Sequence, residues 1–374
     1  MPEEDIYREL QRHLDRMPVG FPATQSGVEI RILKHLFTPE EARVGLCLSA
    51  IPEPISLVHR RIRGEMSLDE LRGTLDRMAE RGAIRRFGTA EGARYGKSIF
   101  AIGMYEAQVN RLTEEFERDA RQYLQEAFGG ALHTTNTPQF RTVPINQAIM
   151  PERGIASYDD IRTAVRESEG PFAVLNCICR QGKDLLGEPC RQTHDRENCL
   201  TLGVAARAVA EQGVGRSVSR DEMLGMLDRA DHEGLVLEPQ NTRNPLFVCC
   251  CCGCCCGVLT TAKALPRPAE FFSTNYEAAV DASICQECGT CAVRCQMDAL
   301  ATDGGAARVD LSRCIGCGLC VSTCPSGAMR LRKRQRERVP AMDTGALYAQ
   351  IFRERYGPWG MAIAVGRKML GLKV

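Results

Sequence analysis

The cysteines constrain this chain more than any other feature, because nineteen of the twenty lie between Cys177 and Cys324. Only Cys47 stands apart, and we expect it to be an ordinary buried thiol. Dense cysteines at short spacings are typical of metal binding, whereas disulfide-stapled secreted proteins are short and carry a signal peptide. This chain has 374 residues and opens with the charged sequence MPEEDIYREL. We therefore expect a cytoplasmic protein with reduced, metal-binding thiols.

The last eight cysteines form two similar runs. The first is Cys285-x-x-Cys288-x-x-Cys291-x-x-x-Cys295, and the second is Cys314-x-x-Cys317-x-x-Cys320-x-x-x-Cys324-Pro325. A cubane iron–sulfur cluster needs four thiolates, and a tight loop with a cysteine at every third residue supplies three of them from one side. A pair of zinc sites is the alternative, but zinc sites typically pair C-x-x-C units across a longer separation. The spacing therefore favours iron–sulfur clusters.

Over about residues 276 to 333, these runs make the chain resemble the bacterial two-cluster ferredoxin. The resemblance implies two [4Fe-4S] clusters, with the last cysteine of each run binding the other run's cluster. Short strands are expected over 307–310 and 328–331. The chain departs from the family pattern where Gln296, rather than proline, follows Cys295. The implied ligands are Cys285, Cys288, Cys291 and Cys324 for one cluster, and Cys314, Cys317, Cys320 and Cys295 for the other.

Eleven more cysteines lie upstream, including seven of the eight positions from Cys249 to Cys256. Adjacent side chains of an extended chain point to opposite faces, so these seven cannot all reach one metal. Thiolates select iron–sulfur clusters, zinc or copper(I). Because two clusters are already expected, we predict at least one further [4Fe-4S] cluster, with zinc as the alternative. The candidate ligands are Cys177, Cys179, Cys190, Cys199, Cys249, Cys251, Cys252, Cys254 and Cys255.

These upstream cysteines are expected to border one domain, over about residues 155–265. The pattern predicts a helix from Cys199 to Gln212 and a second helix that begins after Ser219 and ends at Gly234. Strands are expected over 235–237 and 246–248, where they would return the chain to the first cysteines. The arrangement resembles uncharacterised iron–sulfur proteins, many from anaerobes, in which it accompanies a terminal ferredoxin domain. That resemblance implies no particular reaction.

Residues 1–110 predict short helices followed by a β-hairpin. Thr38 and Ser67 each begin a capping box, completed by Glu41 and Glu70. Strands are expected over 83–87 and 97–102. Three helices and a hairpin resemble a winged-helix domain, over about residues 27–105. A helix over 106–128, ended by two glycines, and a connecting segment are expected to follow, filling residues 111–154 between this domain and the next.

The charge of the predicted third helix, residues 68–81, indicates whether this domain binds DNA. It carries three basic and four acidic residues, whereas phosphate contacts require basic side chains. DNA is therefore disfavoured, and protein contacts or dimerisation are the preferred role. The hairpin keeps nucleic acid as a minority alternative through Arg85, Arg86, Arg94 and Lys97.

The final segment is strongly basic. Residues 326–374 contain eleven basic and three acidic residues, a net charge of +8 on a chain of +1. Asp343 is expected to cap a helix that Pro358 breaks, and the apolar stretch 359–365 is too short to cross a bilayer. We expect the tail, residues 340–374, to dock to an acidic partner. Peripheral contact with the inner membrane face, or a simple solvated basic face, are the alternatives.

Together these patterns predict an α+β protein with five parts: a winged-helix-like domain (1–110), a helix and connecting segment (111–154), a cysteine-rich domain (155–265), a ferredoxin domain (276–333) and a basic tail (340–374). No P-loop, G-x-G-x-x-G motif or Ser/His/Asp pattern supplies a catalytic residue. We expect an electron-transfer protein, or an electron-transferring subunit of an oxidoreductase, that serves a redox partner protein. The alternative is an iron–sulfur redox sensor acting through the winged helix.

Overall fold

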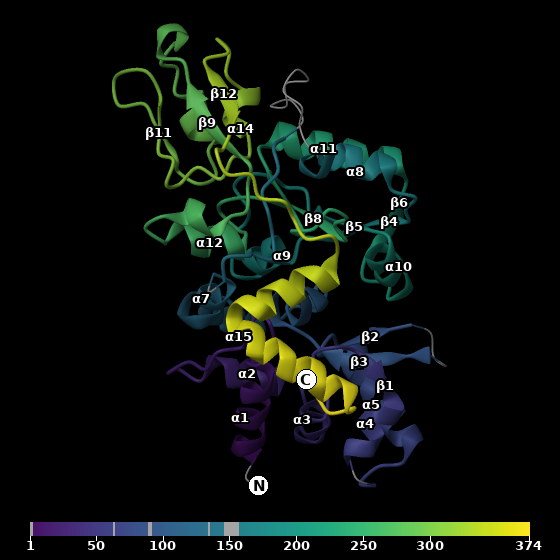
Figure 1. Ribbon diagram of the computed structural model, residues 1–374. Helices are drawn as coiled ribbons and strands as arrows, with labels where there is room; N and C mark the ends of the chain where they lie inside the picture. The colour runs from purple at the N-terminus through teal and green to yellow at the C-terminus, as the bar shows by residue number, and fades with distance from the viewer. Residues whose placement is uncertain (1–2, 63, 89–91, 134, 146–156) are drawn as a thin grey trace. The chain divides into compact units, whose positions relative to one another are not determined.

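The computed structural model describes residues 3–62, 64–88, 92–133, 135–145 and 157–374 (Figure 1). The chain forms two compact units. The first comprises Met1–Thr135 together with Ala349–Val374, and the second comprises Asn136–Tyr348. Helices and strands are mixed throughout, which agrees with the predicted α+β class. Within the described ranges, no helix combines the length and the apolar character that a membrane span requires.

The first unit begins with five helices, and its two predicted capping boxes are both formed, Thr38 with Glu41 and Ser67 with Glu70. Its small antiparallel sheet has the strand order β1-β3-β2, and β1 lies between α3 and α4 in the chain. The helices are α1 (Glu3–Leu14), α2 (Val28–Leu36), α3 (Pro39–Leu46), α4 (Ile55–Ile62) and α5 (Leu68–Glu80). The strands are β1 (Glu53–Pro54), β2 (Ile84–Phe87) and β3 (Arg94–Lys97).

The second strand of the hairpin lies earlier than predicted. The buried side chain of Tyr95 donates a hydrogen bond to Asp76 on α5, which holds residues 94–97 in the sheet. The last residues placed in that strand, Phe100–Ile102, lie outside the sheet in the irregular segment η2 (Phe100–Met104), whose backbone is extended at Ala101 and Ile102. Apolar content alone was therefore a poor guide to this strand.

The helix predicted over 106–128 is also divided differently. A short 3-10 turn, η3 (Glu106–Gln108), is followed by α6 (Glu114–Tyr123), which is capped by Thr113. The helical path continues through η4 (Leu124–Phe128) and α7 (Gly129–Leu132), so the two glycines do not end it. Part of the predicted connecting segment, residues 146–156, lies outside the described residues.

Lys97 is removed from any DNA-binding surface, because it is only 2% exposed. Its ammonium group donates a hydrogen bond to the carbonyl oxygen of His13. Burial lowers the pKa of Lys97 from 10.5 to about 7, and burial also lowers the pKa of His13 to about 3. A second hairpin cation, Arg86, forms an ion pair with Asp76. Two of the four basic residues of the predicted hairpin, Lys97 and Arg86, therefore make contacts within the first unit.

Replacing this buried lysine by methionine should stabilise the first unit at neutral pH. Between about pH 7 and 10.5 the folded state holds Lys97 neutral while the unfolded chain protonates it, so the wild-type protein gains stability as pH rises. The gain approaches about 1.4 kcal/mol per pH unit. We expect the advantage of Lys97→Met in urea unfolding, followed by circular dichroism, to be large at pH 7 and smaller at pH 9. An equal advantage at both pH values would contradict the assignment.

The end of the chain packs within the first unit. Helix α15 (Thr344–Met369) is capped by Asp343 and is interrupted at Gly357, before Pro358, as predicted. Beyond the kink the tail returns to the unit, where Lys373 donates to the carbonyl of Leu46 and the Val374 carbonyl accepts from Ala50. Some of the predicted basic surface is therefore used in intramolecular contacts.

The second unit is built on a five-stranded antiparallel sheet with strand order β6-β4-β5-β8-β7. The predicted strand regions 235–237 and 246–248 overlap β7 and β8, which begin one residue later and extend farther. The strands are β4 (Phe172–Asn176), β5 (Glu197–Leu202), β6 (Arg216–Val218), β7 (Val236–Pro239) and β8 (Phe247–Cys251). The helices are α8 (Ile161–Glu167), α9 (Ile178–Leu185), α10 (Val204–Glu211), α11 (Arg220–Glu233) and α12 (Gly257–Lys263).

One prediction in this domain is wrong in a way that matters for the site. Cys199 lies in strand β5, not at the start of a helix. Leu200 and Leu202 pack into the core, and Gly203 then takes a positive φ of 60°, so the helix begins only at Val204. The helix after Ser219 does form and ends at Gly234 as predicted. Placing Cys199 in the sheet gives it direct neighbours on β8.

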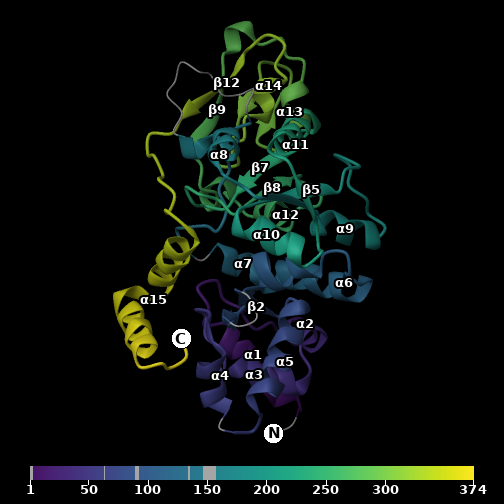
Figure 2. The same cartoon turned by 90° about the vertical axis from the view of Figure 1, so that its right-hand side faces the viewer.

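The ferredoxin-like segment of this unit contains two small antiparallel strand pairs, and the strands predicted over 307–310 and 328–331 are both present. The β9–β12 pair lies beside two short helices (Figure 2). These elements are β9 (Tyr276–Val280), β12 (Met329–Lys333), β10 (Leu300–Ala301), β11 (Arg308–Val309), α13 (Thr290–Arg294) and α14 (Leu319–Ser322). One short 3-10 turn, Pro268–Phe271, precedes β9, and another, Ala282–Ile284, follows it.

Candidate metal centres

One cavity of about 390 Å³ in the ferredoxin-like segment is lined by four cysteines, Cys295, Cys314, Cys317 and Cys320. Backbone N–H groups point at two of the sulfurs: Ala278 donates to Cys314 Sγ at 3.4 Å, and Ala299 donates to Cys295 Sγ at 3.3 Å. Burial raises the pKa values of Cys317 and Cys320 well above the ordinary thiol range. None of these four cysteines is exposed, so we call this the enclosed cavity, and its lining is mainly sulfur and apolar groups.

A second cavity, of about 330 Å³, is lined by Cys285, Cys288, Cys291 and Cys324. The backbone N–H of Met329 donates to Cys324 Sγ at 3.4 Å. The cavity reaches the surface, because Cys288 is exposed. A hydrogen bond from the Thr290 side chain lowers the pKa of this cysteine, and thus stabilises its thiolate.

The two linings agree with the ligand sets that the ferredoxin resemblance implies. Each cavity takes three thiols from one run and the final cysteine of the other run. Four soft thiolates with backbone N–H donors around them fit a [4Fe-4S] cluster. Gly316 is required here, because its φ is 72° and a Cβ atom would lie 2.2 Å from the carbonyl oxygen of Tyr276. The chain's own residues therefore suit two cubane clusters.

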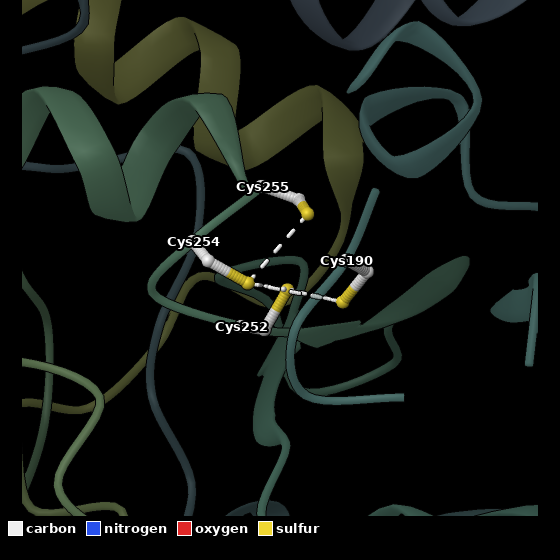
Figure 3. Close-up of side chains that lie close together, drawn as sticks. All are labelled: Cys190, Cys252, Cys254 and Cys255. Carbon is white, nitrogen blue, oxygen red and sulfur yellow. Dashed lines mark hydrogen bonds between the residues drawn. The ribbon is translucent and has the colours of Figure 1, made fainter. Parts of the chain in front are cut away.

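The upstream cysteines separate into two groups. In the first, the sulfurs of Cys190, Cys252, Cys254 and Cys255 all lie within 4.8 Å of one another. Figure 3 shows the four side chains turned toward a common point, with Cys190 coming from the loop between α9 and β5 and the others from the segment between β8 and α12. We call this group the Cys190 quartet.

The spacing within the Cys190 quartet indicates the size of its ligand. The sulfur of Cys190 lies 3.6 Å from that of Cys252 and 3.8 Å from that of Cys254, and Cys254 lies 3.6 Å from both Cys252 and Cys255. Four sulfurs at about 2.3 Å from one tetrahedral ion would be about 3.8 Å apart. Hydrogen bonds from Cys252 and Cys254 hold the pKa of Cys190 well below its usual range. The quartet therefore fits a single tetrahedral ion.

The second group lies at the sheet and consists of Cys177, Cys179, Cys199, Cys249, Cys251 and Cys256, with the carboxylate of Glu238. We call these six cysteines the thiol ring, because each lies close enough to the next to influence its pKa, in a closed circuit. Glu238 contacts the ring at Cys251. All five of the predicted ligands that are not in the quartet or the ferredoxin-like segment belong to it.

Sequence reasoning missed two members of this second group. Cys256 was not among the candidate ligands, and it directly precedes helix α12. Glu238 was omitted because it is not a cysteine, although a carboxylate between Leu237 and Pro239 in an apolar strand was a usable signal. Cys250, also not a candidate, lies apart from both groups. It alternates with Cys249 and Cys251 along β8.

A buried arginine lies beside both groups. Arg180 on α9 is 0% exposed, and it donates to the carbonyl oxygen of Cys250 at 3.0 Å. Its positive charge interacts with Cys177 of the thiol ring and with Cys190 and Cys252 of the quartet. Because buried charges are costly unless paired, this cation favours the thiolate forms on both sides.

Gln296, where the chain departs from the ferredoxin pattern, connects the enclosed ferredoxin cavity to the Cys190 quartet. Its side-chain oxygen accepts from the backbone N–H of Gly253 at 2.7 Å, and its amide donates to Gln192 at 3.1 Å. Gly253 lies between two quartet cysteines, and Gln192 lies two residues after the third. Proline has no such side chain, so Gln296 ties the Cys295 loop to both segments of the quartet.

The tight fit at Gly253 leads to a stability prediction. A Cβ atom there would lie 2.3 Å from the backbone oxygen of Gln296, so Gly253→Ala must displace one of the two loops. We expect a loss of about 1–3 kcal/mol of stability and weaker metal retention by the quartet. Gly305→Ala is the matched control, since nothing lies within 4 Å of its added methyl group. Thermal unfolding and metal analysis would compare them; equal behaviour of the two variants would refute the prediction.

Comparison with known proteins adds one finding. Residues 307–330 match the 4Fe-4S binding domain family, and no curated protein and no solved structure is similar enough to be matched with the chain. The matched segment contains the second cysteine run, which contributes ligands to both cavities. The comparison and the cysteine clusters together indicate iron–sulfur electron transfer. This part of the chain is therefore a ferredoxin-type iron–sulfur domain that binds a [4Fe-4S] cluster.

Proposed function

We propose that the protein transfers single electrons between a redox partner protein and a metal centre in its cysteine-rich domain, through two [4Fe-4S] clusters. The observation that carries this proposal is the pair of four-cysteine cavities, each lined by thiols from both runs. When bound, such clusters supply one-electron redox chemistry at potentials set by hydrogen bonds and solvent exposure. The protein acts as an electron-transfer component rather than a stand-alone enzyme.

The exposed cavity is the proposed entrance for electrons. Cys288 at its rim is exposed, whereas no cysteine of the other cavity is exposed. Two apolar side chains in the same loop region, Ile284 and Val293, are 41% and 88% exposed. Electron-transfer partners form small and transient interfaces, and exposed apolar side chains beside the cavity suit such a contact. We therefore place the partner protein at this face.

The enclosed cavity is the proposed link to the upstream domain. One of its ligands, Cys295, is followed directly by Gln296, which is hydrogen-bonded to Gly253 in the cysteine-rich segment. This contact holds the two regions of the second unit close together. We assign the Cys190 quartet a structural role, with a single zinc ion in a closed four-thiolate site that leaves no open coordination position.

The test is reductive titration of the anaerobically purified chain, followed by iron and sulfide analysis and EPR spectroscopy. Two ferredoxin-type clusters account for about eight irons and should each accept one electron. We expect both to be reduced by a low-potential viologen and reoxidised by a soluble electron acceptor. Clusters that assemble but accept no electrons would refute the electron-transfer proposal while leaving the metal sites intact.

A redox sensor that binds DNA through the first unit is a weaker candidate. The order of α2–α5 and the β2–β3 hairpin suits the winged-helix resemblance, but Lys97 is buried and Arg86 is paired with Asp76. Binding to duplex DNA that varies steeply with salt and with cluster oxidation would favour the sensor. Binding that depends on neither would favour the protein-contact role.

The tail remains a proposed docking surface for an acidic protein, with an anionic membrane as the alternative. Trp359 is 81% exposed and Met369 is 83% exposed on α15, close in sequence to Arg367 and Lys368. Apolar and basic side chains together suit either partner. Co-sedimentation with anionic and with neutral vesicles separates the two, since only the membrane role predicts selective binding to anionic vesicles.

A further inference from the structure

The thiol ring and Glu238 have no role in the ferredoxin cavities or in the Cys190 quartet. We propose that these seven side chains hold a polynuclear iron–sulfur centre, separate from the quartet and from the ferredoxin clusters. This inference deepens the electron-transfer proposal, because it identifies the centre that the clusters would serve.

The sheet register places four of the ligands on one face. Cys249 on β8 pairs with Cys199 on β5 and, on the other side, with Glu238 on β7. Side chains at directly paired positions lie on the same face of an antiparallel sheet, so these three groups form a row across three strands. Cys251 lies two residues farther along β8 and therefore faces the same way.

The remaining ligands come from the ends of the elements beside this row. Cys177 directly follows β4, Cys179 lies in the first turn of α9, and Cys256 directly precedes α12. Cys177 contacts Cys179 and Cys199, and Cys256 contacts Cys179 and Cys251. These contacts close the circuit that the row begins through Cys249. Strands and loops distant in sequence thus converge on one buried site.

The spacing of the ring distinguishes it from a site for one ion. Among the residues that the structure describes, only the Cys190 quartet and the trio of Glu238, Cys251 and Cys256 bring three or more ligand atoms within 4.8 Å of one another. The other ring thiols lie near their neighbours in the circuit, but no three of them in the described residues lie within 4.8 Å of one another. Six thiols also exceed the four ligands of a tetrahedral ion. The ring therefore offers more thiols, more widely spread, than a single ion can bind.

Glu238 supports a metal ligand at this site independently of the thiols. It is 1% exposed, and its Oε1 atom has no hydrogen-bond partner within the described parts of the chain. Burying a carboxylate oxygen without a partner is costly, whereas a metal ion would satisfy it. An oxygen donor is a poor ligand for copper(I), which prefers soft sulfur donors, and it is acceptable to iron.

Charge also argues for several cations. Six thiolates and one carboxylate would carry a charge of about −7, and such charge must be compensated when it is buried. Arg180 contributes one positive charge beside Cys177. If all seven groups bind as anions, the remainder must come from metal ions. Iron with bridging sulfide is the choice consistent with the same unit's ferredoxin-type domain, since the chain must already receive both.

The experiment compares two neighbouring cysteines of β8 in the full chain. Cys249→Ser removes a ring ligand, whereas Cys250→Ser changes the adjacent position that belongs to neither group. After anaerobic purification, iron, sulfide and zinc are measured and Mössbauer spectra are recorded. We expect wild-type protein to contain more than the about eight irons of two ferredoxin-type clusters. Cys249→Ser should lose that excess iron and sulfide, while Cys250→Ser should retain it.

Two further readouts make the test decisive. Glu238→Gln should alter the Mössbauer spectrum of the excess iron with the ferredoxin EPR signals unchanged, and Cys256→Ser should repeat the loss if Cys249→Ser proves unstable. Wild-type protein with about eight irons, or zinc or copper in the ring, would overturn the proposal. So would equal losses in Cys249→Ser and Cys250→Ser. Loss of the ferredoxin signals with the excess iron present would instead count against the electron-transfer proposal alone.

Discussion

Replacing Cys324 by serine should remove or convert the exposed ferredoxin cluster, even though this cysteine belongs to the second run. Its sulfur lines the cavity of Cys285, Cys288 and Cys291. Cys295→Ser should instead remove or convert the cluster of the enclosed cavity, although Cys295 belongs to the first run. Each variant is expected to lose up to about four of the irons and one of two reduced-state EPR signals.

The rate at which the remaining cluster is oxidised shows whether the last cysteine of each run binds the other run's cluster or its own. After Cys324→Ser the surviving cluster should be the enclosed one, which reacts slowly with an added oxidant such as ferricyanide. After Cys295→Ser the survivor should be the exposed one, which reacts quickly because Cys288 reaches the surface. The reverse order of rates would show that each run binds its own cluster.

Cys47→Ser is the matched control for both variants. Cys47 lies in the first unit, between α3 and β1, and burial raises the pKa of its thiol. It lines neither cavity. Its replacement should leave the iron content, the EPR signals and the oxidation rates at their wild-type values. A loss of iron in this variant would mean that serine substitutions perturb the clusters indirectly.

The ferredoxin-like part could be anticipated from sequence because its information is local. A cysteine at every third residue specifies a tight loop, and Gly316 and Gly318 supply the positive φ that such a loop needs. The strands flanking the second run were predicted over 307–310 and 328–331, and both are present. Gln296 was recognised as a departure, but its partner Gly253 is 43 residues away in sequence. Only the folded chain reveals that contact.

In the cysteine-rich part, the sequence indicated that the cysteines bind metal, but not how they divide into two groups. Because side chains of an extended chain alternate between faces, the seven cysteines from Cys249 to Cys256 were predicted not to share one metal. Cys249 and Cys252 do belong to different groups. The division into a quartet and a ring depends on strand register, which pairs Cys249 with Cys199 and Glu238. The expected helix at Cys199 concealed this pairing. Register is set by the packing of Leu200 and Leu202 in the core, and local propensity does not report it.

Arg180→Met should weaken the retention of metal by the Cys190 quartet and the thiol ring. Arginine 180 is the positive charge beside Cys177, Cys190 and Cys252, and methionine fills similar volume without charge. Thiolates that lose this partner are less stable, so their metals should dissociate more readily. Outer-sphere partners of metal ligands typically change affinity by about 10–100-fold. We expect a loss of that size in competition with a chelator.

The size of this effect must be separated from a loss of folding. Arg207→Met is the control, because Arg207 is an exposed arginine on α10 of the same unit. Arg180→Lys keeps the charge but not the planar donor group that reaches the Cys250 carbonyl, so it should retain more metal than Arg180→Met. Unchanged ferredoxin EPR signals in all three variants would show that the second unit is folded. Full metal retention by Arg180→Met, with those signals intact, would mean that the buried cation serves packing alone.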